Sequence, residues 1–262
     1  MYNFEFTKPT TVEEAAQAMA AEGAQALGGG QTLIPTMKQR LASPGTLVSM
    51  TGVESMVGIT QSGGTLTIGG ATTHATVASE AATSYPGLAG LAAHIGDPAV
   101  RNRGTIGGSL ANNDPAACYP AGALGSGATI TTNTRDIAAD DYFQGMFDTA
   151  LDEDEIITSV SFPIPEKSNY QKFDQPASRF ALVGVYVAKF ADGVRVAVTG
   201  ASNNGVFRWS EAEAALSGSF SPEAIDGLSM SADDMIADLH GSAEYRAHLV
   251  GVLTKRAVAA AS

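Results

Sequence analysis

The sequence predicts an α+β protein built in three parts, which we expect at residues 1–55, 56–176 and 177–262. Three observations lead to this fold class. The first part has a capped helix among short strand patterns, and the second has alternating segments among alanine-rich helices. In the third part, two long apolar stretches flank Ala191-Asp192-Gly193, which is a strong signal for a β-hairpin.

In the first part, Thr11-Val-Glu-Glu14 is a capping box, whose hydroxyl and carboxylate accept hydrogen bonds from free N–H groups at a helix start. We expect this helix to stop at Gly23, since glycine commonly follows a helix end. Residues 24–27 are interpreted as a short buried strand that breaks into a glycine loop, and residues 46–50 as a second strand. These elements make a small βαβ unit.

In the second part, apolar and polar residues alternate around Ser62-Gly63-Gly64, which predicts a hairpin. Alanine-rich helices are expected near 73–82 and 87–95, a further hairpin over 127–143, and a strand over 154–165. The acidic run at 151–157 is interpreted as a solvated turn before that strand. In the third part, the last helix places Tyr245, Leu249 and Leu253 on one face.

Composition excludes several classes of protein. The chain has 262 residues, with 15 Lys+Arg against 27 Asp+Glu and a net charge of −12, so we expect no nucleic-acid partner. Cys118 is the only cysteine, so this chain can form no internal disulfide and cannot hold an iron–sulfur cluster by itself. With no signal-peptide pattern and no run of about 18 apolar residues, we expect a cytoplasmic protein.

Two glycine loops are the candidate binding elements. Residues 28–32 read GGGQT, and residues 104–109 read GTIGGS. Glycines let a ligand approach the peptide groups closely, and free N–H groups at a helix start attract anions. Each loop alone is equally explained as a tight turn between a strand and a helix. As a pair in adjacent subdomains, they indicate a diphosphate-bearing cofactor held between them.

Other candidates have simpler interpretations. Asn112, Asn113 and Asp114 can bind sugar or ribityl hydroxyls, although Asp114-Pro115 also resembles a helix N-cap followed by proline. Arg101 and Arg103 flank the second loop and are expected to form surface ion pairs. His74 is expected at the surface, and Cys118 as a small buried residue without an activating partner.

The segments LGGGQTLIPTMKQRLA and GDPAVRNRGTIGGSLANNDPAACYPA resemble the FAD-binding medium subunits of the molybdenum hydroxylases, the group of carbon monoxide dehydrogenase and xanthine dehydrogenase. The resemblance extends over essentially the whole chain. It implies a two-subdomain FAD-binding fold of the vanillyl-alcohol oxidase/PCMH type, followed by a C-terminal α+β domain with a three-stranded antiparallel sheet and helices.

The resemblance also implies the position of the cofactor. The FAD pyrophosphate would lie between the two glycine loops, Asn112 and Asp114 near the ribityl or ring portion, Ile95 and Ile157 against the flavin or adenine, and Phe180 over the isoalloxazine. The cofactor-binding residues implied in this way are Leu27, Gly28, Gly29, Gly30, Gln31, Thr32, Leu33, Ile95, Thr105, Ile106, Gly107, Gly108, Ser109, Asn112, Asp114, Ile157 and Phe180.

Four positions depart from the family pattern. Gly28 stands where alanine is usual and Thr32 where serine is common, and both changes are conservative. Cys118 replaces an aspartate found in many relatives. Asp174 lies near a position that some relatives fill with a basic residue, so their electron acceptor cannot be carried over to this chain.

By the same resemblance, this chain is the FAD-carrying electron-transfer subunit of a heterotrimer. A large subunit with a molybdopterin cofactor and a small subunit with [2Fe–2S] clusters would be its partners, in a dimer of heterotrimers. The external acceptor would be a quinone, NAD or oxygen, with an association at the inner face of the membrane if the acceptor lies there. The alternatives are a stand-alone flavin oxidase of the same fold and a non-enzymatic assembly module.

Overall fold

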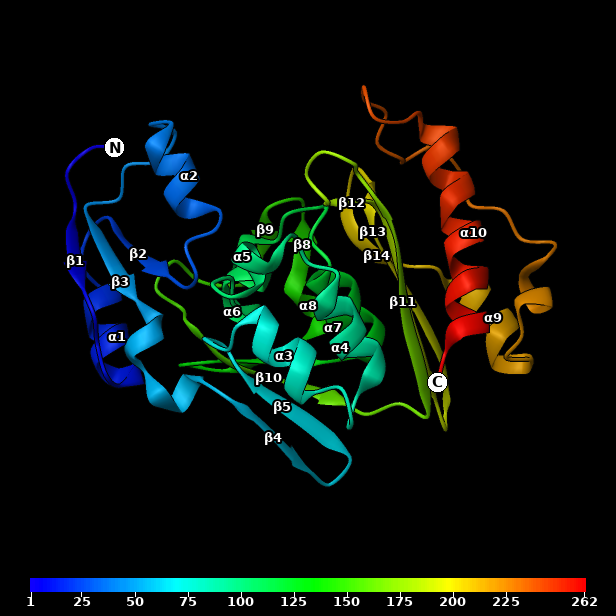
Figure 1. The fold of residues 1–262 in the computed structure, drawn as a ribbon, viewed down its shortest axis with the longest axis horizontal. Coiled ribbons are helices and arrows are strands. Elements are labelled where there is room, and N and C mark those ends of the chain that lie inside the picture. Colours follow the sequence, from blue (N-terminus) through cyan, green and yellow to red (C-terminus); the bar gives the residue numbers. More distant parts are fainter.

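The computed structural model describes all residues from 1 to 262. Figure 1 shows three parts in a row, with the N-terminal part (blue) at one end and the C-terminal part (yellow to red) at the other. The middle part, coloured cyan to green, lies between them. The mixed helix and strand content agrees with the expected α+β class.

The N-terminal part is a three-stranded parallel sheet in the order β1-β3-β2. The capping box is present, because Thr11 Oγ1 accepts from the Glu14 N–H at 3.1 Å. The Glu14 carboxylate accepts from the N–H of Thr10, one residue earlier than expected. The strand at 24–27 is half-buried rather than buried. The elements are β1 (Glu5–Thr7), α1 (Val12–Met19), β2 (Ala24–Leu27), α2 (Leu33–Lys38) and β3 (Thr46–Ser49), followed by the 3-10 turns Met50–Gly52 and Glu54–Met56.

The middle part contains an antiparallel sheet in the order β4-β5-β10-β6-β7, which includes both expected hairpins and the expected strand. Helices cover one face of this sheet (Figure 1). The strands are β4 (Ile59–Ser62), β5 (Thr65–Gly69), β6 (Thr129–Thr132), β7 (Asp136–Ala138) and β10 (Ile157–Pro163), with a small hairpin of β8 (Phe143–Gly145) and β9 (Asp148–Thr149). The helices are α3 (His74–Glu80), α4 (Pro86–Ala93), α5 (Pro98–Arg101), α6 (Ile106–Asn112), α7 (Tyr119–Ser126) and α8 (Ala139–Tyr142).

The C-terminal sheet has four antiparallel strands, so the expected count of three is wrong. Its edge strand β11 begins at Lys167, ahead of residue 177, where the sequence predicts this part to begin. The strands are β11 (Lys167–Asp174), β12 (Ala181–Phe190), β13 (Gly193–Ser202) and β14 (Gly205–Arg208), followed by α9 (Ser210–Gly218), the 3-10 turn Pro222–Ile225 and α10 (Ala243–Ala260).

Helices cover both faces of this sheet. Tyr186 and Ala197 belong to the core that includes α4 and α7, whereas Val185 and Val196 belong to the core that includes α9 and α10. A strand covered on both faces is apolar along its whole length, which explains the continuous apolar run of β12. The middle and C-terminal parts are therefore joined by a shared core.

The apolar face predicted for α10 is only partly correct. Leu249 and Leu253 are buried, but the side chain of Tyr245 is exposed. Tyr245 lies in the first turn of the helix, where it packs edge-on against Phe173 with ring centroids 6.0 Å apart.

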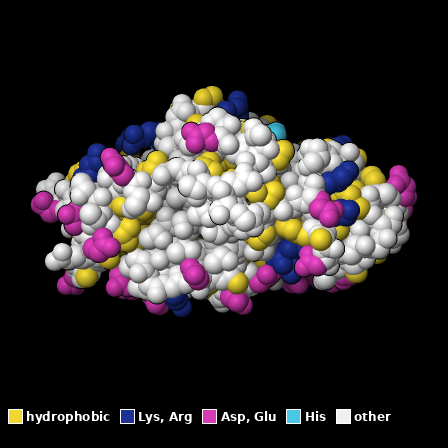
Figure 2. Space-filling model, turned by 90° about the horizontal axis from the view of Figure 1, so that it is seen from below, with side chains coloured by type: hydrophobic (Ala, Val, Ile, Leu, Met, Phe, Trp, Pro, Cys, Tyr) yellow, Lys and Arg dark blue, Asp and Glu magenta, His cyan; other side chains and the backbone are white.

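The surface carries more acidic than basic side chains, as the net charge of −12 requires. On the face shown in Figure 2, Asp and Glu are spread over the molecule and the few Lys and Arg side chains stand apart. No helix has the length and apolar character needed to cross a membrane.

Candidate cofactor-binding cleft

A cleft of about 910 Å³ lies between the N-terminal and middle parts, within the range typical of small-molecule sites. Both glycine loops line it, together with residues from the β8–β9 hairpin and from the loop before β12. All of the implied cofactor-binding residues lie along it except Ile95 and Ile106. Those that line it are Leu27, Gly28, Gly29, Gly30, Gln31, Thr32, Leu33, Thr105, Gly107, Gly108, Ser109, Asn112, Asp114, Ile157 and Phe180.

The first loop offers uncommitted hydrogen-bond donors. Strand β2 ends at Leu27 and α2 begins at Leu33, and the backbone N–H groups of residues 28–33 donate to no acceptor in the protein. Gly30 adopts φ +70°, a conformation that favours glycine, and so lets the chain turn between strand and helix. Consecutive free N–H groups next to a helix start form an anion-binding concavity.

The second loop uses its donors within the protein. The N–H groups of Ile106 and Gly107 donate to the carbonyls of Thr72 and Gly70 at 3.1 and 2.9 Å. The Gly108 N–H donates to Thr105 Oγ1 at 3.2 Å, which caps α6. The two loops therefore differ: the second is anchored to the turn after β5, and the first is open to a ligand.

The glycines also allow the two loops to touch. A Cβ on Gly29 would lie 1.9 Å from the Arg103 carbonyl oxygen, and one on Gly28 would lie 2.6 Å from Thr105 Oγ1. A Cβ on Gly107 would lie 2.7 Å from the Gly70 oxygen. These positions therefore require glycine because the two loops and the turn after β5 touch there. This reason is separate from the expected approach of a ligand.

Ile95 and Ile106 lie elsewhere. The side chain of Ile106 is fully buried in the core of the middle part, and Ile95 packs against the same core. The carbonyls of Ile95 and Gly96 accept from Arg101 Nη1 at 3.1 and 3.0 Å. Arg101 therefore braces this turn and does not form the surface ion pair that the sequence predicts.

The three residues of the Asn112–Asp114 segment make different contacts. Asn112 lines the cleft, whereas Asn113 Nδ2 turns away and donates to the carbonyls of Gly145 and Asp148, both at 2.8 Å. Asp114 Oδ1 accepts from the Ala116 N–H at 2.8 Å within a turn. The helix-cap interpretation of Asp114 is wrong, since the next helix begins at Tyr119. Burial raises the pKa of Asp114.

His74 is buried at the cleft wall and is not at the surface. Its ring occupies the space next to Gly104, where a Cβ would lie 2.5 Å from Nε2. Burial, together with the charge of Arg101, lowers the pKa of His74 to about 4, so the ring is neutral near pH 7. His74 Nδ1 has no hydrogen-bond partner in the protein.

Lys172, which the sequence analysis did not single out, lies behind the wall of the cleft, where it contacts the lining residues Cys118 and Arg179. Its side chain is 1% exposed. Nζ donates to the carbonyls of His94 and Arg179 at 2.6 and 2.8 Å, pairs with the Asp174 carboxylate at 3.0 Å, and lies 3.8 Å from Cys118 Sγ. One buried ammonium group therefore ties the C-terminal end of α4 to the loop that carries Phe180.

The sequence does contain a signal for Lys172. In β11, Ser168 and Tyr170 are buried and Lys172 follows them at the same spacing of two, so all three side chains point to one face. A lysine in the inward-facing positions of a strand is unusual unless it is paired. Recognising it required β11 to be identified as a strand first.

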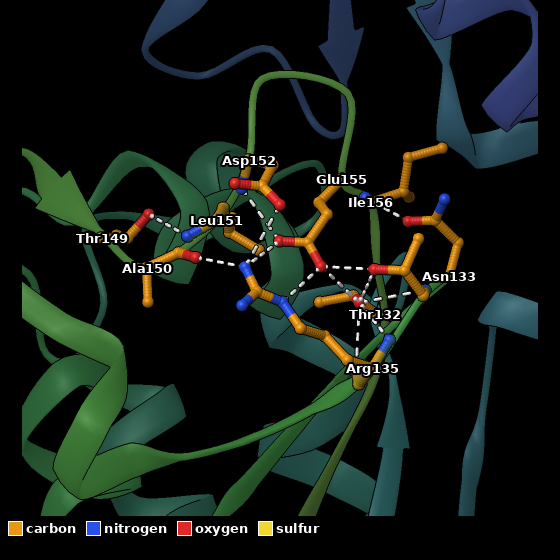
Figure 3. Close-up of polar contacts among 10 residues, drawn as sticks. Thr132, Asn133, Arg135, Thr149, Ala150, Leu151, Asp152, Glu155 and Ile156 are labelled. Carbon is orange, nitrogen blue, oxygen red and sulfur yellow. Dashed lines mark hydrogen bonds and ion pairs between the residues drawn. The ribbon is translucent and has the colours of Figure 1, made fainter.

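The acidic run at 151–157 contains the expected solvated turn before β10, with Asp152, Glu153 and Asp154 exposed, but Glu155 is buried and anchors the segment at the wall of the cleft. Figure 3 shows the Glu155 carboxylate among Thr132, Arg135 and the backbone of Asp152. It accepts from Arg135 Nε and Nη2 at 2.9 and 2.8 Å and from the Asp152 N–H at 2.8 Å. Chiefly through these Arg135 hydrogen bonds, the pKa of Glu155 is lowered to about 2. This network fixes the segment that places Ile156 and Ile157 in the cleft.

Comparisons with known proteins agree with this geometry. Residues 2–165 match the family model described as the FAD binding domain in molybdopterin dehydrogenase. The nicotine 6-hydroxylase medium subunit of Paenarthrobacter nicotinovorans is 34% identical, over 97% of this chain and 95% of that protein. The carbon monoxide dehydrogenase medium chain of Afipia carboxidovorans is 31% identical, over 98% and 96%.

Solved structures give the same result. A chain of the Cu,Mo-CO dehydrogenase superposes with a TM-score of 0.89 at 30% identity, over 98% of this chain and 96% of that one. A chain of carbon monoxide dehydrogenase from Hydrogenophaga pseudoflava gives 0.88 at 32%, over 99% and 97%. The protein belongs to the family of FAD-binding medium subunits of molybdenum-dependent dehydrogenases and hydroxylases.

The contact between the glycine loops predicts the effect of Gly29→Ala. The added methyl group meets the Arg103 carbonyl, so the loops must separate, at a cost of about 1–3 kcal/mol in the free energy of unfolding. The purified variant should retain clearly less FAD than the wild type, measured as the ratio of flavin to protein absorbance. Gly90→Ala is the matched control, because a Cβ there meets no atom within 4 Å. Full FAD content in Gly29→Ala contradicts the role given to this contact.

Lys172→Met should loosen the loop before β12. It leaves the carbonyls of His94 and Arg179 without their donor, which lowers the free energy of unfolding by about 2 kcal/mol. Limited proteolysis should then cut within residues 174–180. Lys189→Met, which removes an exposed ion pair to Glu166 just before β11, should change stability by less than about 1 kcal/mol. Equal losses in the two variants argue against a special role for Lys172.

The Glu155 network predicts an acid sensitivity with a definite sign. The pKa of Glu155 is about 2 in the folded protein and close to its ordinary value of 4.5 in the unfolded chain, so its stabilisation is complete above pH 4.5 and is lost as the pH falls towards 2. Glu155→Gln should lower the free energy of unfolding at pH 7 by about 3 kcal/mol and flatten its dependence on pH over this window. Chemical denaturation as a function of pH measures both effects. The exposed neighbour variant Glu153→Gln should behave as the wild type does.

Proposed function

We propose that this chain is the electron-transfer subunit of a heterotrimeric molybdenum hydroxylase. It takes electrons from a small [2Fe–2S] subunit and passes them to an external acceptor, while a large molybdenum-cofactor subunit oxidises the substrate. The observation that carries this proposal is the cleft in which the free N–H groups of residues 28–33 face the anchored second glycine loop. The names of the relatives, which are medium subunits of such enzymes, support it.

The donor set fits the diphosphate of FAD. Arg179 is the one Lys or Arg side chain along the cleft, so peptide N–H groups supply most of the positive potential for an anion. The hydroxyls of Thr32 and Ser109 also line the cleft and add two donors. We assign the pyrophosphate to residues 28–33 and Ser109.

The two ends of the cleft suit the two ends of the cofactor. Met19, Met50 and Met56 line the end under the N-terminal part, where their flexible side chains suit the flat adenine. Asn112 and Asp114 lie towards the other end, with an amide and a carboxyl group for ribityl hydroxyls or ring nitrogens. Phe180 from the C-terminal part lines that end and would shield the isoalloxazine from water.

The flavin supplies the ability to accept electrons as a pair and release them again. The protein binds the cofactor through peptide dipoles, orients it between the open first loop and the anchored second loop, and tunes its surroundings. The ammonium group of Lys172 lies directly behind the loop that carries Phe180 and contributes positive potential at this end. We further propose that the complex is a dimer of heterotrimers in the cytoplasm.

A stand-alone flavin oxidase would need a proton-transferring group beside the ring. The candidates along the cleft are His74, which is buried and neutral near pH 7, and Asp114, whose carboxyl group we assign to ribityl hydroxyls or ring nitrogens. Turnover of an organic substrate by the isolated chain would favour the oxidase; electron entry only through a partner favours the proposed subunit.

The decisive experiment is the visible spectrum of the protein co-expressed with its genomic neighbours. We expect flavin absorbance, FAD released on denaturation at about one per chain, and iron and molybdenum in the co-purifying subunits. A colourless protein that also fails to bind added FAD would overturn the proposal. FAD without partner subunits would support cofactor binding but refute the heterotrimer.

A further inference from the structure

The turn between β8 and β9 carries an aromatic side chain in an unfavourable backbone conformation. The two strands pair at Gly145 and Asp148, so Met146 and Phe147 form the turn between them. Phe147 adopts φ +57°, in the left-handed region where a turn favours glycine or asparagine. A bulky residue is strained in this conformation, so the surrounding structure must hold it there.

The hydrogen bonds of Asn113 hold this turn. Asn113 Nδ2 donates to the carbonyls of Gly145 and Asp148, both at 2.8 Å. The Phe147 N–H donates to the Asn113 carbonyl at 3.0 Å. Asn113 is buried and ends α6 with φ +41°, a conformation that asparagine adopts more readily than most residues. One residue therefore contacts the hairpin before, at and after Phe147.

The hairpin is anchored at two further points. Arg135 Nη2 donates to the Ala150 carbonyl, just after β9, at 2.7 Å (Figure 3). On the other side, a Cβ on Gly205 in β14 would lie 3.1 Å from the Gly145 oxygen, so the hairpin lies directly against the C-terminal sheet. Backbone contacts with the middle and C-terminal parts thus fix the turn.

The side chain of Phe147 adds nothing to the hydrophobic cores of this chain. It is 62% exposed and belongs to none of the three cores, but it lines the cofactor cleft. Met146, the other residue of the turn, is also exposed and does not line the cleft. The strained residue is therefore the one at the cleft, and strain without a gain in packing indicates a role in binding.

The contacts of Asn113 place Phe147 at one end of the cleft. Asn112 and Asp114, on either side of Asn113 in the chain, line the end that we assign to the isoalloxazine. Phe180 also lines the cleft and is 48% exposed. Two exposed aromatic side chains along one cleft suit the faces or edges of a flat ring system.

We propose that Phe147 is a cofactor-contact residue that covers the isoalloxazine end of FAD at the opening of the cleft, and that Asn113 is its positioning residue. The inference rests on the proposed function and adds two residues outside the implied cofactor-binding set. The phenyl group of Phe147 loses exposed apolar surface when it packs against the cofactor, and it excludes water there. This contact offsets the backbone strain only while the cofactor is bound.

The test uses the FAD-loaded complex, co-expressed with its genomic neighbours. Phe147→Gly removes the phenyl group and accepts the left-handed conformation without strain. Asn113→Gly also accepts its positive φ and deletes only the two side-chain hydrogen bonds. Met146→Ala, in the same turn but outside the cleft, is the matched control, and Phe147→Tyr keeps the ring. The readouts are the rate of FAD release on dilution and the quenching of flavin fluorescence by iodide.

We expect FAD release to be about fivefold faster and iodide quenching about twofold stronger in Phe147→Gly and Asn113→Gly. Met146→Ala and Phe147→Tyr should behave as the wild type does. After removal of FAD, the Phe147→Gly chain should have a melting temperature at least as high as that of the wild type, because glycine relieves the strain.

Wild-type release and quenching in Phe147→Gly overturn the inference. A lower melting temperature of the FAD-free Phe147→Gly chain also overturns it, because the phenyl group would then stabilise the fold itself. Loss of partner subunits with unchanged iodide quenching overturns it as well, since Phe147 would then face a partner and not the cofactor. Absence of FAD from the wild-type complex would instead refute the proposed function.

Discussion

The contact between the two glycine loops is the constraint on which the rest of this structure depends. Gly29 lies so close to the backbone of Arg103 and Gly104 that no side chain fits between them. The contact seats the N-terminal part on the middle part and thereby defines the cleft. Because the second loop commits its N–H groups to Gly70 and Thr72, it is rigid, and the first loop keeps its N–H groups free. Two segments of similar composition thus differ in whether their N–H groups are committed within the protein.

The C-terminal part contributes residues to the cleft. Its sheet shares a core with the helices of the middle part, and the loop that precedes β12 reaches into the cleft. Lys172 makes this possible, since a buried ammonium group is stable only when every donor finds an oxygen. The carbonyls of His94 and Arg179 meet this need and, in return, are held in place.

The charge of the surface and of the cleft does not favour an anion. The surface is acidic, and the cleft is lined by carboxylates as well as by peptide groups, so charge alone does not attract a dinucleotide. The groups that we propose for the diphosphate are the free N–H groups of one loop, which a small change in backbone position would misalign. The network around Glu155 and the hydrogen bonds of Arg101 both hold backbone segments near the cleft in place. Their charged groups are therefore used within the protein.

The sequence by itself determined the class of fold, most elements and the two glycine loops that line the cleft. Local rules are enough for these: the capping box at Thr11, the turn at Ala191–Gly193 and the glycine-rich loops report on neighbouring residues only. Tertiary structure alone decided which polar residues face inward. His74 and Glu155 look like surface residues because Gly104 and Arg135, which they contact, are distant in the sequence. The spacing of Lys172 with Ser168 and Tyr170 indicates its inward direction, but His94, whose carbonyl accepts from its ammonium group, is also distant. Likewise Ile106 lies in the second glycine loop and Ile95 precedes it, but tertiary packing places Ile106 in the core and Ile95 against it. Burial depends on contacts between distant segments, and a single sequence does not record these contacts.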